Sequence, residues 1–180
     1  LDALDGPDGM LAGMSTGAVH ICNTTISPKC ADKLAAIHVE NGGHYASGCV
    51  VGRPDASAAG KLMTILAGDE VAIAQCREVC DAFSVKVVSM PGKVSQANIL
   101  KLALNYTAIS SIELMSEVYT FIEKSGVDLK YIADAYDGLY ANPVMKMYAA
   151  KLASRDFDDG GFTMTGGLKD VSLMLSASED

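Results

Sequence analysis

The stretch from Val94 to Lys124 constrains the fold more than any other part of the chain, because it contains neither proline nor glycine. These two residue types weaken a helix interior most strongly, so their absence predicts one long helix. At a rise of about 1.5 Å per residue, this helix would be roughly 45 Å long. Its apolar side chains are spread around most of the circumference, which is typical of a helix buried on several sides. We therefore expect a central helix with the rest of the chain packed around it.

Near the start of this helix, Asn98, Lys101 and Asn105 follow one another at spacings of three and four residues. Side chains at this spacing share one helix face, so an ammonium and two amides point the same way. This face is the best candidate for a catalytic surface. The alternative is that Lys101 buries its aliphatic stem and extends its charge to solvent, as lysines on apolar helices commonly do. The helix pattern alone favours that alternative.

Charge and composition exclude several classes of function. The formal net charge is -8, whereas nucleic acids and anionic membranes bind basic surfaces, so neither is an expected partner. No run of about 18 residues is both uncharged and predominantly apolar, so we expect no membrane span. The five cysteines are an odd number and no signal peptide precedes them, which favours a reducing cytoplasm. Cys76 and Cys80 are one helical turn apart, but no matching pair exists elsewhere, so we expect packing thiols and no metal site.

Strand and helix patterns alternate in the first half of the chain and give way to helices in the second. Ser27 and Pro28 suit the cap and first residue of a helix, and Asp69 and Glu70 suit the start of another. The sequence therefore predicts an α/β part at residues 1–91, followed by an all-α part at residues 92–180. The expected strands are residues 18–24, 44–51, 61–68 and 85–90, and the expected helices are residues 28–40, 69–82, 94–124, 128–140, 143–154 and 167–178.

The usual short motifs of enzymes do not occur in this sequence. It has no G-x-G-x-x-G turn to hold a pyrophosphate, no Walker sequence, no nucleophile elbow and no H-E-x-x-H. Motifs alone therefore leave an α/β and α protein with one candidate lysine.

Four stretches nevertheless resemble one known family. They are His20–Pro28, Gly52–Pro54 with Ala59–Leu62, Ala97–Asn105, and Gly167–Asp170, and together they span nearly the whole chain. The order and spacing of these four stretches resemble those of the β-hydroxyacid dehydrogenase family, which is related to 6-phosphogluconate dehydrogenase. The family includes 3-hydroxyisobutyrate dehydrogenases, tartronate semialdehyde reductases and glyoxylate reductases.

The resemblance implies that the chain is a fragment of a longer enzyme. Residues 1–91 would be the C-terminal part of a Rossmann-type dinucleotide-binding domain, without the half that bears the glycine fingerprint. Residues 92–180 would supply the long interdomain helix and a helical substrate and dimerisation domain, incomplete at its far end. On its own, such a fragment is expected to bind NAD or NADP poorly and its activity is in doubt, because the missing turn normally holds the pyrophosphate.

The resemblance also implies roles for particular residues. Lys101 matches the family's catalytic lysine, which donates a proton to the substrate oxygen and takes it back in the reverse reaction. Asn105, one turn along, would bind the substrate. The remaining matches are Thr24, Thr25 and Asp170 for substrate binding, and Thr25, Phe162 and Lys169 for the cofactor, NADP or NAD. For Lys169 and Asp170, the alternative is an ordinary surface pair at a helix start.

Two departures from the family pattern bear on the substrate. Val51 stands where many members have a serine that binds the substrate carboxylate, and Ser95-Gln96-Ala97 replaces a G-x-G before the lysine. Both features resemble a branch near the imine reductases, and they imply a more apolar pocket. Imine reductases generally replace the lysine, however, so Lys101 favours carbonyl and alcohol chemistry.

Three functions follow as hypotheses. The first is an NAD(P)-dependent oxidoreductase that transfers a hydride between nicotinamide and a small hydroxy acid or its carbonyl form. The second is an imine reductase-like enzyme, and the third is a non-catalytic helical dimerisation module. A strand and a G-x-G-x-x-G turn upstream of Leu1 would favour an enzyme. The resemblance implies pairing through the long helix. Because this helix is apolar on most sides, we expect a homodimer that buries Ile109, Leu114 and Val118.

Overall fold

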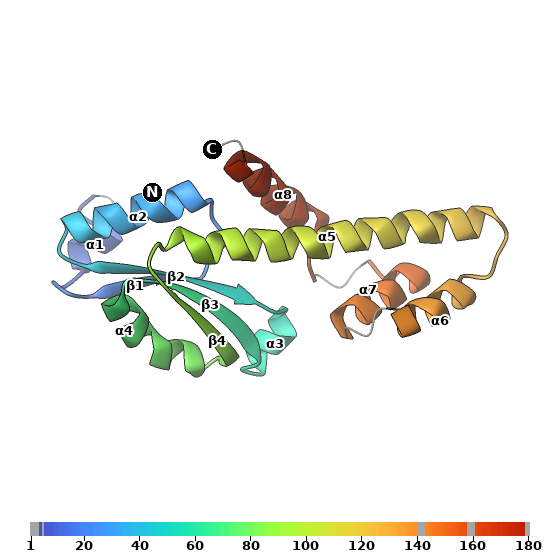
Figure 1. The fold of residues 1–180 in the computed structure, drawn as a ribbon, viewed down its shortest axis with the longest axis horizontal. Coiled ribbons are helices and arrows are strands. Elements are labelled where there is room, and N and C mark those ends of the chain that lie inside the picture. The colour runs from blue at the N-terminus through green and yellow to red at the C-terminus, as the bar shows by residue number, and fades with distance from the viewer. Residues whose placement is uncertain (1–3, 5, 140–142, 158–160, 179–180) are drawn as a thin grey trace. The chain divides into compact units, whose positions relative to one another are not determined.

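The computed structural model describes the chain except for residues 1–3, 5, 140–142, 158–160 and 179–180 (Figure 1). It divides into two compact units. The first comprises Leu1–Ala103 and Asp170–Asp180, and the second comprises Leu104–Lys169. Two helices each contribute residues to both units.

A mixed sheet of four strands forms the centre of the first unit. The strands are β1 (Val19–Cys22), β2 (His44–Val51), β3 (Leu62–Gly68) and β4 (Ser84–Pro91), and they lie in this order across the sheet. The pairs β1–β2 and β3–β4 are parallel, whereas β2 and β3 are antiparallel. The four predicted strands are therefore confirmed. Because β1 and β2 are parallel, their carboxyl ends lie at the same edge of the sheet.

Two helices of the first unit begin where the sequence predicts. Helix α2 (Pro28–Glu40) follows Ser27, whose hydroxyl accepts a hydrogen bond from the Cys30 amide at 3.2 Å. Helix α4 (Glu70–Asp81) follows Asp69, whose carboxylate accepts from the Ala72 amide at 2.7 Å. Each cap satisfies an amide that has no partner within its own helix. Two short helices, α1 (Met10–Gly13) and α3 (Pro54–Ala58), were not predicted.

The two faces of the sheet are covered by different helices, as Figure 1 shows. On one face, Ala46 and Leu66 pack against Ala72, Cys76 and Cys80, so α4 covers this side. Cys76 and Cys80 are buried here as predicted, and burial raises the pKa of Cys80 to about 11. The other face carries α2 and the first turns of the long helix. The first unit thus has three layers, with the sheet between two layers of helices.

The long helix α5 (Ser95–Lys124) has the predicted length, but not the predicted burial. Ile99, Leu114 and Phe121 are 54%, 51% and 68% exposed. The prediction that this helix is buried on several sides is therefore wrong for the single chain. In the described part of the chain, neither α5 nor any other helix is long and apolar enough to cross a membrane.

In the second unit, helices pack around the later part of α5. Helices α6 (Leu129–Leu139) and α7 (Pro143–Ser154) agree with the predicted ranges, except that Tyr140 lies outside the described residues. Helix α8 (Met164–Ser178) begins earlier than predicted, after Thr163, whose hydroxyl accepts from the Gly166 amide at 3.1 Å. The core of the unit consists of Ile112, Met115, Tyr119, Tyr136 and Ala149.

A pair of histidines, the half-buried His20 and the buried His38, lies between α2 and the sheet. The Nδ1–H of His38, a fully buried residue, donates to the Leu34 carbonyl at 2.7 Å, which leaves Nε2 of the neutral ring as an acceptor. His20 Nδ1 lies 3.0 Å from that nitrogen and therefore donates to it. The ring of Tyr45 contacts both imidazoles, with centroids 5.2 and 5.4 Å away. Burial, and then the neighbouring His38, lower the pKa of His20 below its usual 6.5.

This pair predicts that the fold loses stability in mild acid. With a lowered pKa in the folded state, His20 binds a proton more readily when the chain is unfolded. Its contribution to stability is therefore present above pH 6.5 and is lost as the pH falls from there through the folded pKa. Replacing His20 with Asn keeps a donor near His38 but removes the titration. Denaturant unfolding between pH 8 and pH 5 should show a smaller loss for His20→Asn than for the wild type; equal losses would contradict the prediction.

A second prediction concerns the glycine at the start of α8. A Cβ atom on Gly167 would lie 2.7 Å from Cδ1 and 2.9 Å from Cγ1 of Ile109, within the second unit. Gly167→Ala should therefore destabilise the unit by about 1–3 kcal/mol, the usual cost of overpacking. Gly138→Ala is the matched control, because it adds the same methyl group to a helix where nothing lies within 4 Å. Thermal unfolding should show that the control is neutral or gains up to about 1 kcal/mol; a neutral Gly167→Ala would refute the close contact.

Candidate active site

The first turns of α5 lie directly on the sheet. Ala97 is fully buried against Cys49, Ile65 and Ala67, and its small side chain lets the helix backbone approach the strands closely. Lys101 follows Ala97 by one turn and so extends from nearly the same side of the helix. Its side chain is half-buried. The local sequence therefore turns this lysine toward the sheet and not toward open solvent.

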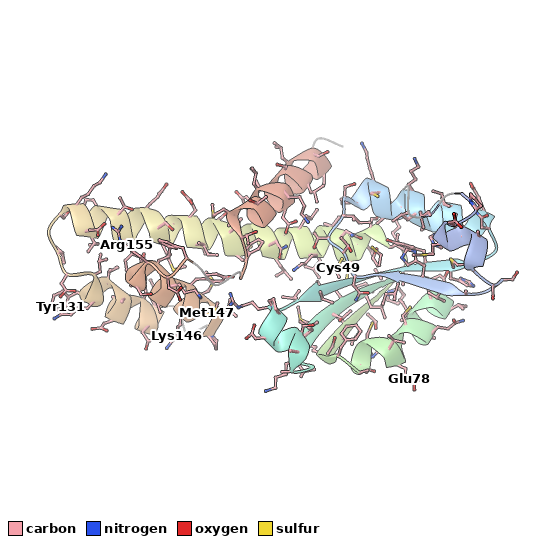
Figure 2. The ribbon with its side chains drawn as sticks, turned by 180° about the vertical axis from the view of Figure 1, so that it is seen from behind. Cys49, Glu78, Tyr131, Lys146, Met147 and Arg155 are labelled. Atoms are coloured by element: carbon pink, nitrogen blue, oxygen red, sulfur yellow. The ribbon has the colours of Figure 1, made fainter. Side chains whose placement is uncertain are left out.

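The packing of Ala97 with Cys49 brings the next turn of α5, which carries Lys101, near the second half of β2. Burial, followed by the neighbouring Cys22 thiol, raises the pKa of Cys49 to about 11, while the Lys101 ammonium acts in the opposite direction. Cys22 is the last residue of β1, and Cys49 lies in the second half of β2. Figure 2 labels Cys49, between the sheet and α5. Lys101 therefore belongs to the carboxyl-terminal edge of the parallel pair, where α/β sheets commonly bind ligands.

The loop after β1 carries the two predicted threonines. Thr24 is exposed and Thr25 is half-buried, and the loop ends at the cap residue Ser27. Asn98, three residues before Lys101, is 1% exposed, and its amide nitrogen lies 3.4 Å from the carbonyl oxygen of Ile26 in this loop. The structure therefore brings the threonine loop and the Lys101 turn of α5 to the same edge of the sheet.

The turn after β2 is apolar where the family pattern has a hydroxyl. Val51 packs against the cluster of Cys49, Ile65, Ala67 and Ala97. Gly52 has a φ of +146°, which disfavours other residues, and a Cβ there would lie 2.5 Å from Cδ2 of Leu62. The turn therefore packs closely on β3. Because its residue 51 is a valine, the turn offers no side-chain hydroxyl to a substrate at this position.

The remaining predicted residues are divided between the units. Asn105 is half-buried in α5, one turn beyond Lys101, but it belongs to the second unit. Phe162 and Lys169 also lie in the second unit; the Phe162 amide donates to the Tyr148 hydroxyl at 3.2 Å, and Lys169 is exposed. Asp170 belongs to the first unit and is 4% exposed. An approach of Asn105, Phe162 and Lys169 to Lys101 around a ligand stays a prediction.

Sequence reasoning did not assign a role to Asn98 or Cys49. Asn98 shares a helix face with Lys101 and was visible as a candidate for that reason. Cys49 gave no local signal, because its proximity to Lys101 depends on how α5 packs on β2.

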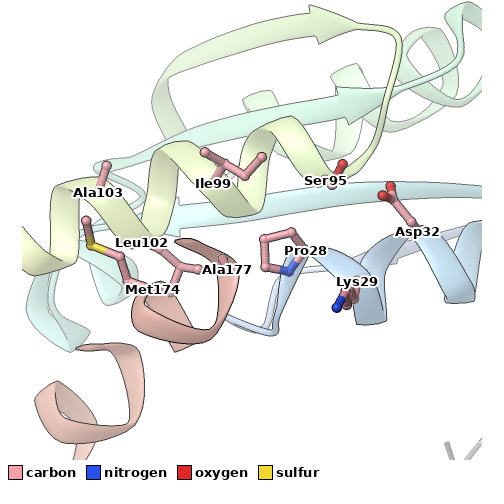
Figure 3. A pocket seen from close by; sticks show the side chains of 9 residues that line it. All are labelled: Pro28, Lys29, Asp32, Ser95, Ile99, Leu102, Ala103, Met174 and Ala177. Carbon is pink, nitrogen blue, oxygen red and sulfur yellow. The ribbon is translucent and has the colours of Figure 1, made fainter. Parts of the chain in front are cut away.

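A separate groove lies on another side of α5, within the first unit (Figure 3). Its volume is about 410 Å³. Three helices line it, largely with apolar side chains. These side chains include Pro28 of α2, Ile99 and Leu102 of α5, and Met174 of α8. Lys101 and the two threonines are not part of its lining. The groove is therefore distinct from the candidate site.

Comparison with known proteins gives consistent matches. A family model described as the NAD-binding domain of 6-phosphogluconate dehydrogenase matches residues 1–92. An uncharacterized oxidoreductase of Bacillus subtilis (strain 168), YfjR, is 34% identical over 97% of this chain and 61% of its own length. The 2-hydroxy-3-oxopropionate reductase of Escherichia coli (strain K12) is 24% identical over 99% of this chain and 61% of its own length.

Among solved structures, the 3-hydroxyisobutyrate dehydrogenase ygbJ of Salmonella typhimurium has a similar fold, with a TM-score of 0.82 and 20% sequence identity. The alignment covers 96% of this chain and 60% of that one. The chain thus spans about three fifths of the length of these relatives. The match in fold supports the Rossmann-type assignment of the sheet and the helices that follow it.

Proposed function

We propose that this chain, which belongs to the family described as the NAD-binding domain of 6-phosphogluconate dehydrogenase, is part of a nicotinamide-dependent oxidoreductase. The enzyme would transfer a hydride between NAD or NADP and a small hydroxy acid or its carbonyl form. The observation that carries the proposal is the position of Lys101, half-buried on the sheet side of α5 with its charge near the carboxyl ends of β1 and β2. The oxidoreductase names of the relatives support the same chemistry.

The residues at this edge suit the nicotinamide end of such a cofactor. Two threonine hydroxyls lie on the loop after β1. Polar groups of this kind can bind a carboxamide or a carboxylate. The sequence contains no glycine-rich turn for the pyrophosphate, so residues outside this chain would hold that part. We assign cofactor contacts to Thr25, Phe162 and Lys169, and substrate contacts to Thr24, Thr25, Asn105 and Asp170.

In the proposed mechanism, a bound nicotinamide would supply or accept the hydride, and Lys101 would donate or accept the proton. Reduction of a carbonyl adds a hydride to carbon and a proton to oxygen. The Lys101 ammonium donates that proton as negative charge develops on the oxygen, and the neutral amine takes it back during oxidation. Asn105 orients the substrate from the next turn of the helix.

We also propose the division of roles along the chain. Residues 1–91 would be the C-terminal part of the dinucleotide-binding domain, and residues 92–180 the helical part that binds substrate and a second subunit. The five cysteines are free thiols, which supports a cytoplasmic location. A small-molecule substrate fits the acidic net charge of -8 better than a nucleic acid does.

An imine reductase is the second candidate, and Val51 favours it. An apolar turn here removes a contact for a substrate carboxylate and so suits a less charged substrate. Lys101 favours the hydroxy-acid activity, because an ammonium stabilises a developing alkoxide. Assays of the intact protein with both hydroxy acids and cyclic imines, followed by the absorbance of the reduced cofactor, distinguish the two. If the protein is inactive on both hydroxy acids and cyclic imines, the remaining hypothesis is a non-catalytic dimerisation module.

The proposed proton donor predicts a large effect from one substitution. In the intact protein, Lys101→Met keeps the length and apolar stem of the side chain but removes the ammonium. Turnover should fall roughly 10²- to 10⁴-fold, the usual contribution of general acid catalysis, while cofactor affinity changes little. Lys124→Met, at the far end of the same helix, should keep normal turnover. Near-normal activity of Lys101→Met on every hydroxy acid that the wild type oxidises would refute the role of Lys101 as the proton donor.

We further propose a homodimer that covers the exposed side of α5. Ile109, predicted at the interface, is already buried at 8% within the chain, whereas Leu114 and Phe121 are 51% and 68% exposed. Leu100, 36% exposed, precedes Leu114 by fourteen residues and Phe121 follows it by seven, so the three lie along one side of the helix. Such an apolar row is typical of a contact between helices. A second copy of the chain would bury it.

The dimer predicts a specific effect of charge in this row. Leu114→Glu places a carboxylate in the proposed interface and should shift the intact protein toward monomer in light scattering at low micromolar concentration. Thr120→Glu adds the same charge to an exposed position on a different side of α5 and should leave the dimer intact. A wild-type monomer at these concentrations would refute the proposal.

A further inference from the structure

Asn98 connects the long helix to the threonine loop. The side chain is 1% exposed, and its amide nitrogen lies 3.4 Å from the carbonyl oxygen of Ile26, 72 residues earlier in the sequence. The hydrogen bond is longer than the usual 2.7–3.2 Å of an N–H···O bond, yet it spans two elements that chain connectivity does not hold together. It therefore constrains the loop relative to α5.

Both ends of this contact lie close in sequence to proposed site residues. Ile26 directly follows Thr24 and Thr25, and its side chain packs against the core cluster beneath α2. Asn98 precedes Lys101 by three residues on the same helix face. The contact consequently fixes the loop that carries both hydroxyls relative to the helical turn that carries the lysine.

The oxygen of the same amide shows that an asparagine at this position costs the fold some stability. Oδ1 of Asn98 is buried without a hydrogen-bond partner among the described residues. Rotating the amide would not relieve this, because the oxygen would then face the Ile26 carbonyl, another acceptor. An unsatisfied buried polar group destabilises the fold, and a leucine of similar shape would avoid that destabilisation. Packing alone therefore does not explain an asparagine at this position.

We propose that Asn98 is a positioning residue, which holds the Thr24–Thr25 loop at the productive distance from Lys101. The inference rests on the proposed oxidoreductase function and adds a residue to that site. Asn98 would act through the loop, without contact to the reacting atoms. Misplacement of a substrate-positioning group by about 1 Å can cost on the order of 10²-fold in rate, so one hydrogen bond at this point has a measurable effect.

The test combines stability, amide exchange and kinetics of the intact protein. Asn98→Leu removes the donor and keeps the volume, so the fold should be as stable as the wild type or more stable. Hydrogen exchange of the peptide that contains Thr24 to Ile26 should become faster. On hydroxy-acid substrates kcat should fall roughly ten- to a hundred-fold, while the pH dependence of kcat/KM keeps its shape because Lys101 itself is unchanged.

Two further variants make the outcome decisive. Gln96→Leu makes the same amide-to-leucine change at an exposed position of the same helix and should alter neither exchange nor kcat. Asn98→Ala gives a second, smaller side chain without the donor, so it should loosen the loop even if leucine fits poorly. Unchanged loop exchange in both Asn98 variants, or a loss of activity that only follows the folded fraction, would overturn the inference.

The same measurements separate this inference from the proposed function. If the wild-type protein transfers no hydride to or from any hydroxy acid or imine, the proposed function fails, and Asn98 has no reaction to position whatever the exchange shows. If the wild type is active and Asn98→Leu exchanges faster at normal kcat, the function stands and the positioning role is refuted.

Discussion

The contact between Ala97 and the sheet determines where Asn98 and Lys101 of α5 point. Ala97 is fully buried against Cys49, Ile65 and Ala67, and a larger residue would move the helix away from the strands. A helix held closely at one residue also has a fixed rotation about its own axis. Asn98 and Lys101, one and four positions later, therefore face the carboxyl ends of β1 and β2. The candidate site depends on this packing more than on any interaction within the site.

Local signals predicted the elements of the fold well, because they act over a few residues. Ser27 with Pro28 and Asp69 with Glu70 determine where α2 and α4 begin, and the absence of proline and glycine determines the length of α5. The short helix α3 was missed, since a proline at a first helical position is also typical of a turn. The predicted burial of α5 failed for a different reason. An apolar pattern shows which side chains avoid water, but not whether the same chain or another one covers them.

The candidate site was only partly predictable for a similar reason. Lys101 was identified from its place in a motif, and its helix face followed from spacing alone. The contact of Asn98 with Ile26 and the influence of Lys101 on Cys49 join segments that are far apart in sequence. Such contacts depend on the register of the sheet and the rotation of α5, which no local pattern contains. Asn105, Phe162 and Lys169 lie in the other compact unit, so their part in the site rests on the family pattern alone.

The surroundings of Lys101 also bear on the kind of oxygen that it would protonate. A thiolate at Cys49 would neutralise much of the ammonium charge, but burial raises the pKa of this thiol to about 11 and keeps it neutral at physiological pH. Val51 adds no polar group at the neighbouring turn. In a half-buried position a charge is screened less than at the surface, so the field of Lys101 acts more strongly on a ligand at this edge. A developing alkoxide gains from that field, whereas a neutral amine product would not, which favours carbonyl reduction over imine reduction at this site.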